Sequence, residues 1–277
     1  MYFYDLQFTI GMYNIGMLYK IFLLSLNTSF IKRVLRKFGI RKLSPRKEDL
    51  ENAPLIKKYI SGKSFADIGC MWGVNGLNSF IAEENGATKV TAVDVYPESK
   101  EFLEKKNNNN SKIQYVKGDI NLLSTTQKIG IADVVLCAGV LYHTPDPVHL
   151  LTQLRSICGE ILILSTSIVP ESPGIRNTAV FYPFLDANQR KIWNRGVGTQ
   201  KAITGPYEPE SGYGNWFWGF SPSCVESMLQ CSGFEVIEKY IFPFNSTFVC
   251  RVVSSKFIAK SGEWTTPQDA DFAKFKR

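Results

Sequence analysis

The sequence predicts an α/β fold built on a doubly wound, Rossmann-like parallel sheet. From about residue 55 to residue 170, short apolar runs alternate with segments of helical pattern. A glycine-bearing stretch, FADIGCMWGVNG over residues 65–76, leads from the first strand of that series into its first helix. Alternation at this spacing favours parallel strands joined by right-handed helical crossovers.

Each element of the series follows from the same alternation. Strands are expected at residues 64–69, 89–95, 112–119, 132–139 and 160–168, and helices at 74–84, 99–106 and 148–156. The rhythm breaks after residue 170 and resumes with a helix within 221–234, which starts with serine and proline at cap and first-turn positions. Two antiparallel strands are expected to follow at 235–242 and 246–254.

With 277 residues, the chain is longer than a typical domain, so we expect a core with appendages. We divide it into an N-terminal helical, basic extension (1–55), a core (56–170), an insertion (171–220) and a C-terminal helix with strands that complete the core sheet (221–277). A long segment without clear periodicity is typical of a lid or binding insert. The aromatic residues of the insertion are Phe181, Tyr182, Phe184, Trp193, Tyr207, Tyr213, Trp216, Phe217, Trp218 and Phe220.

The net charge of +7 comes from one basic block in the N-terminal extension, because the rest of the chain carries 24 basic and 25 acidic residues. Its basic block has no acidic residue and consists of Lys32, Arg33, Arg36, Lys37, Arg41, Lys42, Arg46 and Lys47. Such a block can contact the phosphates of tRNA, contact an anionic membrane surface, or form a solvated helix face. The apolar run at residues 8–26 is a poor signal peptide and a marginal membrane span; it fits peripheral membrane contact or a helix packed on the core.

The cysteines and histidines indicate no metal site. The six cysteines form no CxxC pair, and the sequence holds two histidines, His143 and His149. Cys137 stands in an apolar run and is expected to be a buried strand residue. A reducing cytoplasm is the expected location.

The glycine loop argues against a dinucleotide cofactor. In the GxGxxG pattern the second glycine lets a pyrophosphate approach the backbone, but Met71 stands at that place. S-adenosylmethionine has no phosphates, and Asp94, 25 residues after Gly69, is suitably placed for its ribose hydroxyls. Asp119 is expected to accept a hydrogen bond from the adenine amino group. Asp67 is expected to brace the loop and help receive the amino-acid end.

Five segments resemble successive motifs of class I S-adenosylmethionine-dependent methyltransferases: DIGCMWG, VDV, KGD, ADVVLCAGVLYHTPDPVHLLTQL and GEILILST. The resemblance covers roughly residues 60–170, with a weaker echo in MLQCSGFEVIE. It implies the topology of that class and S-adenosylmethionine as cofactor. The expected cofactor-binding residues are Asp67, Gly69, Cys70, Trp72, Gly73, Asp94, Val95, Asp119, Ile120, Ala138 and Gly139.

More narrowly, GVLYHTPDPVHLLTQLR followed by GEILILSTSIV is similar to the tRNA wobble-uridine 5-oxyacetic acid synthase family. That family transfers a carboxymethyl group from carboxy-S-adenosylmethionine. The carboxylate of this cofactor would need a positive partner, and none adjoins the loop, although a lysine or arginine could come from elsewhere in the chain. The resemblance implies that Tyr142 positions the transferred group, and a packed aromatic is the alternative. Met71 and Trp72 depart from the small residues common in the family, and we expect Trp72 at the mouth of the cofactor pocket.

His143 is the candidate general base, because an unperturbed histidine has a pKa of about 6.5. Its alternative role is to stabilise the turn or line the pocket. His149 is expected on the surface or in packing. The fourth strand is followed neither by the [DN]PP[YFW] motif of base-amine methylation nor by a Pro-Cys pair, which leaves oxygen acceptors, or a carbon or nitrogen acid of a small molecule.

The leading expectation is a methyltransferase acting on a small-molecule or glycan-like acceptor, with O-methylation favoured. The second is a transferase of methyl or carboxymethyl groups to the wobble uridine of tRNA. The third is a non-catalytic binding protein that keeps the fold. The aromatic insertion is expected to close the acceptor pocket, with a second small core as the alternative.

Overall fold

The computed structural model describes residues 52–190, 206–242 and 245–254. The basic block and the apolar run of the N-terminal extension lie outside the described residues. Their expected contacts with tRNA or a membrane surface stay predictions, as does the cytoplasmic location. Among the residues described, no helix has the length and apolar character needed to cross a membrane.

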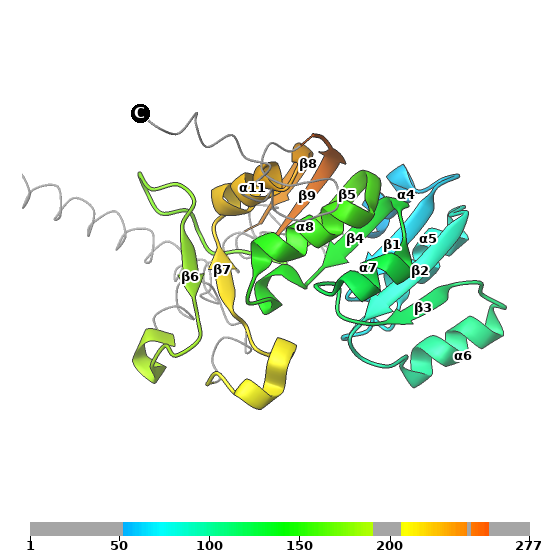
Figure 1. Ribbon diagram of the computed structural model, residues 1–277, viewed down its shortest axis with the longest axis horizontal. Helices are drawn as coiled ribbons and strands as arrows, with labels where there is room; N and C mark the ends of the chain where they lie inside the picture. The colour runs from blue at the N-terminus through cyan, green and yellow to red at the C-terminus, as the bar shows by residue number, and fades with distance from the viewer. Residues whose placement is uncertain (1–51, 191–205, 243–244, 255–277) are drawn as a thin grey trace, which may run out of the picture. The chain divides into compact units, whose positions relative to one another are not determined.

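A seven-stranded sheet forms the centre of the fold, in the order β3-β2-β1-β4-β5-β9-β8 (Figure 1). Neighbouring strands from β3 to β5 run parallel, whereas β9 is antiparallel to both β5 and β8. The strands are β1 (Ser64–Ile68), β2 (Lys89–Asp94), β3 (Gln114–Lys117), β4 (Ala132–Ala138), β5 (Cys158–Ser167), β8 (Phe234–Ile241) and β9 (Asn245–Val252). The doubly wound α/β sheet and its two antiparallel C-terminal strands are confirmed.

Helices cover both faces of this sheet, as the doubly wound arrangement requires. On one face a buried apolar cluster joins the strands to α7 (Leu123–Ile129), α8 (Pro147–Ile157) and α11 (Pro222–Cys231). On the other face a second cluster joins them to α4 (Ala53–Tyr59), α5 (Leu77–Glu84) and α6 (Lys100–Asn108). The order of the parallel strands reverses between β1 and β4, and ligands bind at such a switch point in sheets of this kind.

The helix expected from residue 74 begins three residues later, at Leu77. Gly73, Asn75 and Gly76 have φ values of 72°, 48° and 73°, which continue the loop instead of a right-handed helix. Gly76 is also closely packed, because a Cβ there would lie 2.3 Å from the Phe102 ring. The helix α7 was not expected, since its short segment lacks a clear apolar periodicity.

The insertion contains a small structure of its own. Its strands β6 (Ala179–Phe181) and β7 (Trp218–Phe220) pair antiparallel and stand apart from the main sheet (Figure 1). Val169, Tyr182 and Trp216 form a separate buried cluster beside them. The second small core, the alternative reading of the aromatic residues, is therefore present, and the same segment also reaches the cavity described next.

Candidate functional site

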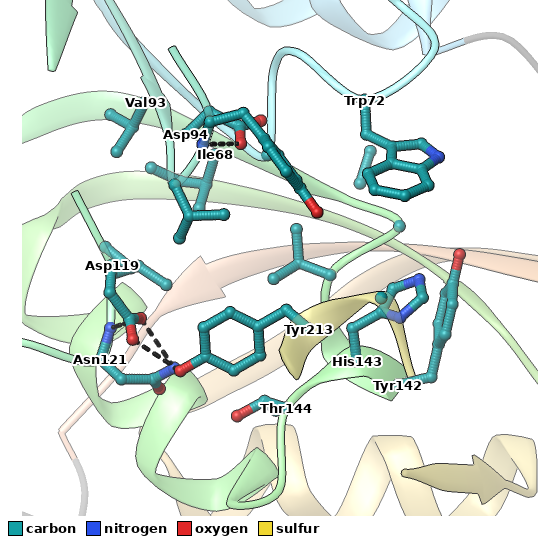
Figure 2. A pocket seen from close by; sticks show the side chains of 18 of the residues that line it. Ile68, Trp72, Val93, Asp94, Asp119, Asn121, Tyr142, His143, Thr144 and Tyr213 are labelled. Atoms are coloured by element: carbon teal, nitrogen blue, oxygen red, sulfur yellow. Dashed lines mark hydrogen bonds between the residues drawn. The ribbon is translucent and has the colours of Figure 1, made fainter. Parts of the chain in front are cut away.

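A cavity of about 360 Å³ lies where β1, β2, β3 and β4 end, with walls from the loops that follow these strands. Such a volume suits one small organic ligand. The predicted residues that line it are Gly69, Trp72, Asp94, Val95, Asp119, Ile120, Ala138, Gly139, Tyr142 and His143. Figure 2 shows two acidic side chains on one side of this cavity and the Tyr142–His143 pair on another.

Three predicted residues do not line the cavity: Asp67, Cys70 and Gly73. Cys70 is fully buried in the core cluster that includes α5. Asp67 is 1% exposed and accepts a hydrogen bond from Ser79 Oγ at 2.7 Å. This bond ties the first strand to α5, as a bracing residue would. Contact between Asp67 and the amino-acid end of a cofactor stays a prediction.

Burial raises the pKa of Asp67 from 3.8 to about 6. Asp67 is neutral in both folded and unfolded chains below pH 4, and charged in both above pH 6. Its desolvation should therefore remove about 3 kcal/mol of stability as pH rises through this window. We expect Asp67→Asn to abolish that loss, so the stability of the native chain relative to the variant should fall by this amount in urea unfolding between pH 3 and 7.

Asp133→Asn is the control for that measurement. Hydrogen bonds from the backbone and side chain of Ser64 lower the pKa of Asp133. The stability that Asp133 contributes is lost as pH falls, which is the opposite sign. A native chain and Asp67→Asn variant with parallel pH profiles would contradict the assignment of the raised pKa to Asp67.

Asp94 fixes the loop after β1. Its Oδ2 accepts a hydrogen bond from the Met71 backbone N at 2.7 Å, and its Oδ1 accepts one from the Tyr96 backbone N at 2.9 Å. Each carboxylate oxygen has a second lone pair, and Asp94 lines the cavity. The carboxylate is thus held in a fixed orientation from which it can also bind a pair of hydroxyls.

The expected role of Met71 needs a correction. Its side chain is 4% exposed and packs in the core, so it does not itself obstruct a pyrophosphate at the position of the second glycine. The argument against a pyrophosphate has another physical basis: the backbone N–H of Met71 is bonded to the Asp94 carboxylate. An anion at this loop would therefore meet a carboxylate where dinucleotide folds offer free amides.

Trp72 is the side chain of the loop that faces the cavity. It is 70% exposed and lines the cavity (Figure 2). It packs against Tyr96 with 5.3 Å between ring centroids. This placement at the mouth is the expected one. Its contact with a cofactor stays a prediction.

Asp119 is held from two directions. Its Oδ1 accepts hydrogen bonds from the backbone N and Nδ2 of Asn121, at 2.9 and 3.1 Å. Its Oδ2 accepts one from the hydroxyl of Tyr213 at 2.6 Å (Figure 2). Tyr213 belongs to η2 (Pro209–Gly214) in the insertion. Burial and the bond to Asp119 raise the pKa of Tyr213 to about 12, so the phenol stays a donor at neutral pH.

His143 and Tyr142 lie on η1 (Leu141–His143), directly after β4. His143 Nδ1 lies 2.8 Å from the backbone O of Asn215. Because a carbonyl oxygen only accepts hydrogen bonds, Nδ1 carries the proton and Nε2 keeps its lone pair. Burial lowers the pKa of His143 below 6.5, which favours the neutral ring at pH 7.

Aromatic rings enclose the same end of the cavity. The Tyr142 ring packs against Trp216 with 4.2 Å between centroids, and against His143 with 4.3 Å. Burial raises the pKa of Tyr142, which keeps its hydroxyl protonated. Trp216 is 8% exposed and, like Tyr213, comes from the insertion. The expected closure of the pocket by aromatic residues agrees with these positions.

His149 has a packing role, as expected. Its Nε2 donates a hydrogen bond to the backbone O of Asn121 at 2.9 Å. Asn121 in turn holds Asp119, so this bond helps to fix the loop that contains both residues. The sequence offered no signal for Asn121 or Thr144, which also line the cavity. Tyr213 and Trp216 were included among the aromatic residues of the insertion, without individual roles.

The charged side chains that line the cavity are the carboxylates Asp94 and Asp119; within the described ranges no lysine or arginine lines it. Such a site favours neutral or cationic ligands over anionic ones. The part of the chain that the structure describes also contains no cluster of side chains suited to a metal ion.

Comparison with known proteins agrees with this geometry. Residues 66–159 match the family described as methyltransferase domain. A tRNA U34 carboxymethyltransferase of Campylobacter lari is 33% identical over 105 residues, which are 36% of this chain and 34% of that protein. The chain therefore matches about a third of the length of this curated relative.

The N-terminal domain of EvdMO1, solved with SAH bound, has the same fold at a TM-score of 0.51 and 15% identity, with 74% of this chain and 80% of that one covered. The same domain solved in the presence of SAH and D-fucose gives a TM-score of 0.51 at 15% identity, with 76% and 84% covered. The family match, the shared fold and the order of the strands show that the chain contains a methyltransferase domain of class I, the S-adenosylmethionine-dependent type.

Proposed function

We propose that the protein is an S-adenosylmethionine-dependent methyltransferase that methylates a hydroxyl group of a neutral small-molecule or glycan-like acceptor. The observation that carries this proposal is the 2.8 Å contact between His143 Nδ1 and the Asn215 carbonyl, which leaves the Nε2 lone pair free, in an aromatic cavity lined by no described cationic residue. A hydroxyl is a weak nucleophile, so a nearby base is useful for this acceptor in particular.

The residues of the cavity fit the cofactor. Asp94 has lone pairs available for two ribose hydroxyls, and Asp119 Oδ2 has one available for the amino group of adenine. Ile68, Val93 and Ile120 supply apolar walls for the base. The two carboxylates also favour a cationic ligand. When bound, the cofactor supplies a methyl group activated by a sulfonium.

The protein's own task is alignment and proton removal. Tyr142 and Trp216 form a wall that orients the acceptor and excludes water, so that oxygen and methyl carbon meet at about 3 to 3.5 Å. Nε2 of His143 takes the hydroxyl proton as the oxygen–carbon bond forms. The proton then rests on an imidazole whose other N–H is already bonded to Asn215.

The charge of the site favours methyl over carboxymethyl transfer. Carboxy-S-adenosylmethionine carries an additional carboxylate, which would face Asp94 and Asp119 without a lining lysine or arginine among the described residues. The same argument disfavours phosphorylated small molecules as acceptors.

The test is turnover of methyl-labelled S-adenosylmethionine with a panel of neutral hydroxylated aromatics and glycans, phosphorylated analogues and tRNA. We expect thermal stabilisation by S-adenosylhomocysteine, and its formation during turnover with a neutral hydroxylated acceptor. Mass spectrometry of the product identifies the methylated oxygen. Absence of stabilisation by either cofactor form would support the non-catalytic alternative instead.

A second candidate function is modification of tRNA, which the relative from Campylobacter lari favours. The basic block at residues 32–47 would then contact phosphates. In the same panel, this candidate requires label in tRNA and binding that weakens steeply with salt. Labelled tRNA with no labelled small acceptor would replace the first proposal.

A further inference from the structure

One short turn of the insertion contacts both ends of the cavity. At the nucleoside end, Tyr213 donates its hydroxyl hydrogen bond to Asp119 at 2.6 Å. At the acceptor end, the backbone O of Asn215 accepts from His143 Nδ1 at 2.8 Å. Figure 2 shows Tyr213 lying between Asp119 on one side and His143 on the other. Tyr213 and Asn215, which are two positions apart in the sequence, thus contact two different functional side chains.

The turn is internally cross-linked. Asn215 is 8% exposed, and its Nδ2 donates to the backbone O of Glu208 at 2.7 Å and of Gly212 at 3.0 Å. Its Oδ1 accepts from the backbone N of Glu208 at 3.0 Å. One buried side chain thus closes residues 208–215, which include Tyr213, into a cross-linked loop.

The turn is also joined to η1 on its other side. The backbone N of Phe217 donates to the backbone O of Tyr142 at 2.9 Å, and Trp216 packs on the Tyr142 ring. These contacts keep residues 215–217 beside His143. The hydroxyl of Tyr213 then fixes the turn to the opposite wall, through the carboxylate that Asn121 holds in place.

We propose that Tyr213 is a positioning residue that links the nucleoside end of the cavity at Asp119 to the tautomer of His143. The bond between Tyr213 and Asp119 holds the turn where the Asn215 carbonyl selects the Nδ1–H form, which leaves Nε2 as the base. Asp119 Oδ2 has one lone pair left beside Tyr213, so an amino donor bound there contacts the same oxygen and senses the same turn. The ligand part of this inference rests on the proposed cofactor.

The imidazole nitrogens report this link without any turnover. The sequence contains two histidines, so a chain labelled with nitrogen-15 histidine gives two simple sets of signals. His149 is an internal reference with the opposite tautomer, because its Nε2 donates to Asn121. In the native chain we expect His143 as Nδ1–H and His149 as Nε2–H, with a change in the His143 shifts on addition of S-adenosylhomocysteine.

Tyr213→Phe removes the hydroxyl and keeps the ring. We expect the His143 signals of this variant to move to a mixture of both tautomers, with His149 unchanged and the response of His143 to S-adenosylhomocysteine at least several-fold smaller. Asn215→Ala, which deletes the cross-links but keeps the backbone carbonyl, should act in the same direction. Tyr240→Phe is the matched control, since it removes an exposed phenol on β8 that bonds Glu238, and it should match the native chain.

A folded Tyr213→Phe protein with native His143 shifts and a native response to the ligand would overturn the inference. A native chain that S-adenosylhomocysteine stabilises thermally without any change in the His143 shifts would contradict the ligand part, and a chain with neither response would contradict the proposed cofactor. The change of tautomer in the ligand-free variant would then still support the positioning role, so the two failures are distinguishable.

Discussion

His143→Ala should lower kcat by about 10²- to 10⁴-fold, the usual contribution of a positioned general base, with little change in the affinity for S-adenosylmethionine. The reason is that Nε2 is the unprotonated nitrogen of a ring fixed by Asn215, at the aromatic end of the cavity. The measurement is steady-state turnover with the acceptor found in the panel. Added imidazole should restore part of the activity of this variant.

The pH profile tests the same residue. Burial lowers the pKa of His143 below 6.5, and the base is active when neutral. For the native enzyme, kcat should therefore rise with pH through an apparent pKa below 6.5 and then stay level, and this limb should be absent in the variants. His143→Gln is the matched variant, because its amide can still donate to the Asn215 carbonyl but cannot accept the acceptor's proton. If kcat of either variant lay within about threefold of the native value, His143 would not be the general base and would have a structural role.

The parallel core was predictable because alternation of apolar runs and helical segments leaves few topologies. The strand-end carboxylates were predictable for the same reason, since parallel strands bring Asp94 and Asp119 to one edge of the sheet. A pattern of residue types thus placed both side chains at the cavity before any geometry was known. It did not give their orientation.

Local backbone geometry caused the errors around residues 71–76. The sequence presents Met71 as a residue of a nucleotide loop, but the loop buries two consecutive side chains, Cys70 and Met71, in the core. The next side chain, Trp72, is 70% exposed. Residues with positive φ delayed the helix until Leu77. Such choices depend on tertiary packing, which residue type alone does not specify.

The contacts made by the insertion were not predictable individually. Tyr213 bonds a residue 94 positions away, and the Asn215 carbonyl bonds one 72 positions away. Neither contact follows a helical or strand period, and one of them uses a backbone oxygen that any residue could offer. Sequence composition indicated a pocket-closing segment, whereas its two polar anchor points required the fold.

Asp94→Ala should weaken S-adenosylhomocysteine binding by about 10²- to 10⁴-fold in calorimetry. Two ribose hydroxyls bonded to a carboxylate contribute about 1.5 to 3 kcal/mol each. The substitution also frees the backbone N–H groups of Met71 and Tyr96, so the loop that carries Trp72 loses its fixed position. Loss of ligand contacts and loss of loop order therefore act in the same direction.

Two variants separate these contributions. Asp94→Asn keeps the size of the side chain but turns an amide N–H toward one of the two backbone donors, so we expect a loss of affinity smaller than that of alanine. Asp133→Ala removes a carboxylate that bonds Ser64 at the opposite edge of the sheet, and its affinity should equal the native value. Because Asp94 would bind the ribose through a carboxylate charge that two backbone N–H groups hold in place, the affinity for S-adenosylhomocysteine should decrease from the native chain to Asp94→Asn and then to Asp94→Ala. Native affinity in Asp94→Ala would place the ribose elsewhere and remove Asp94 from the cofactor site.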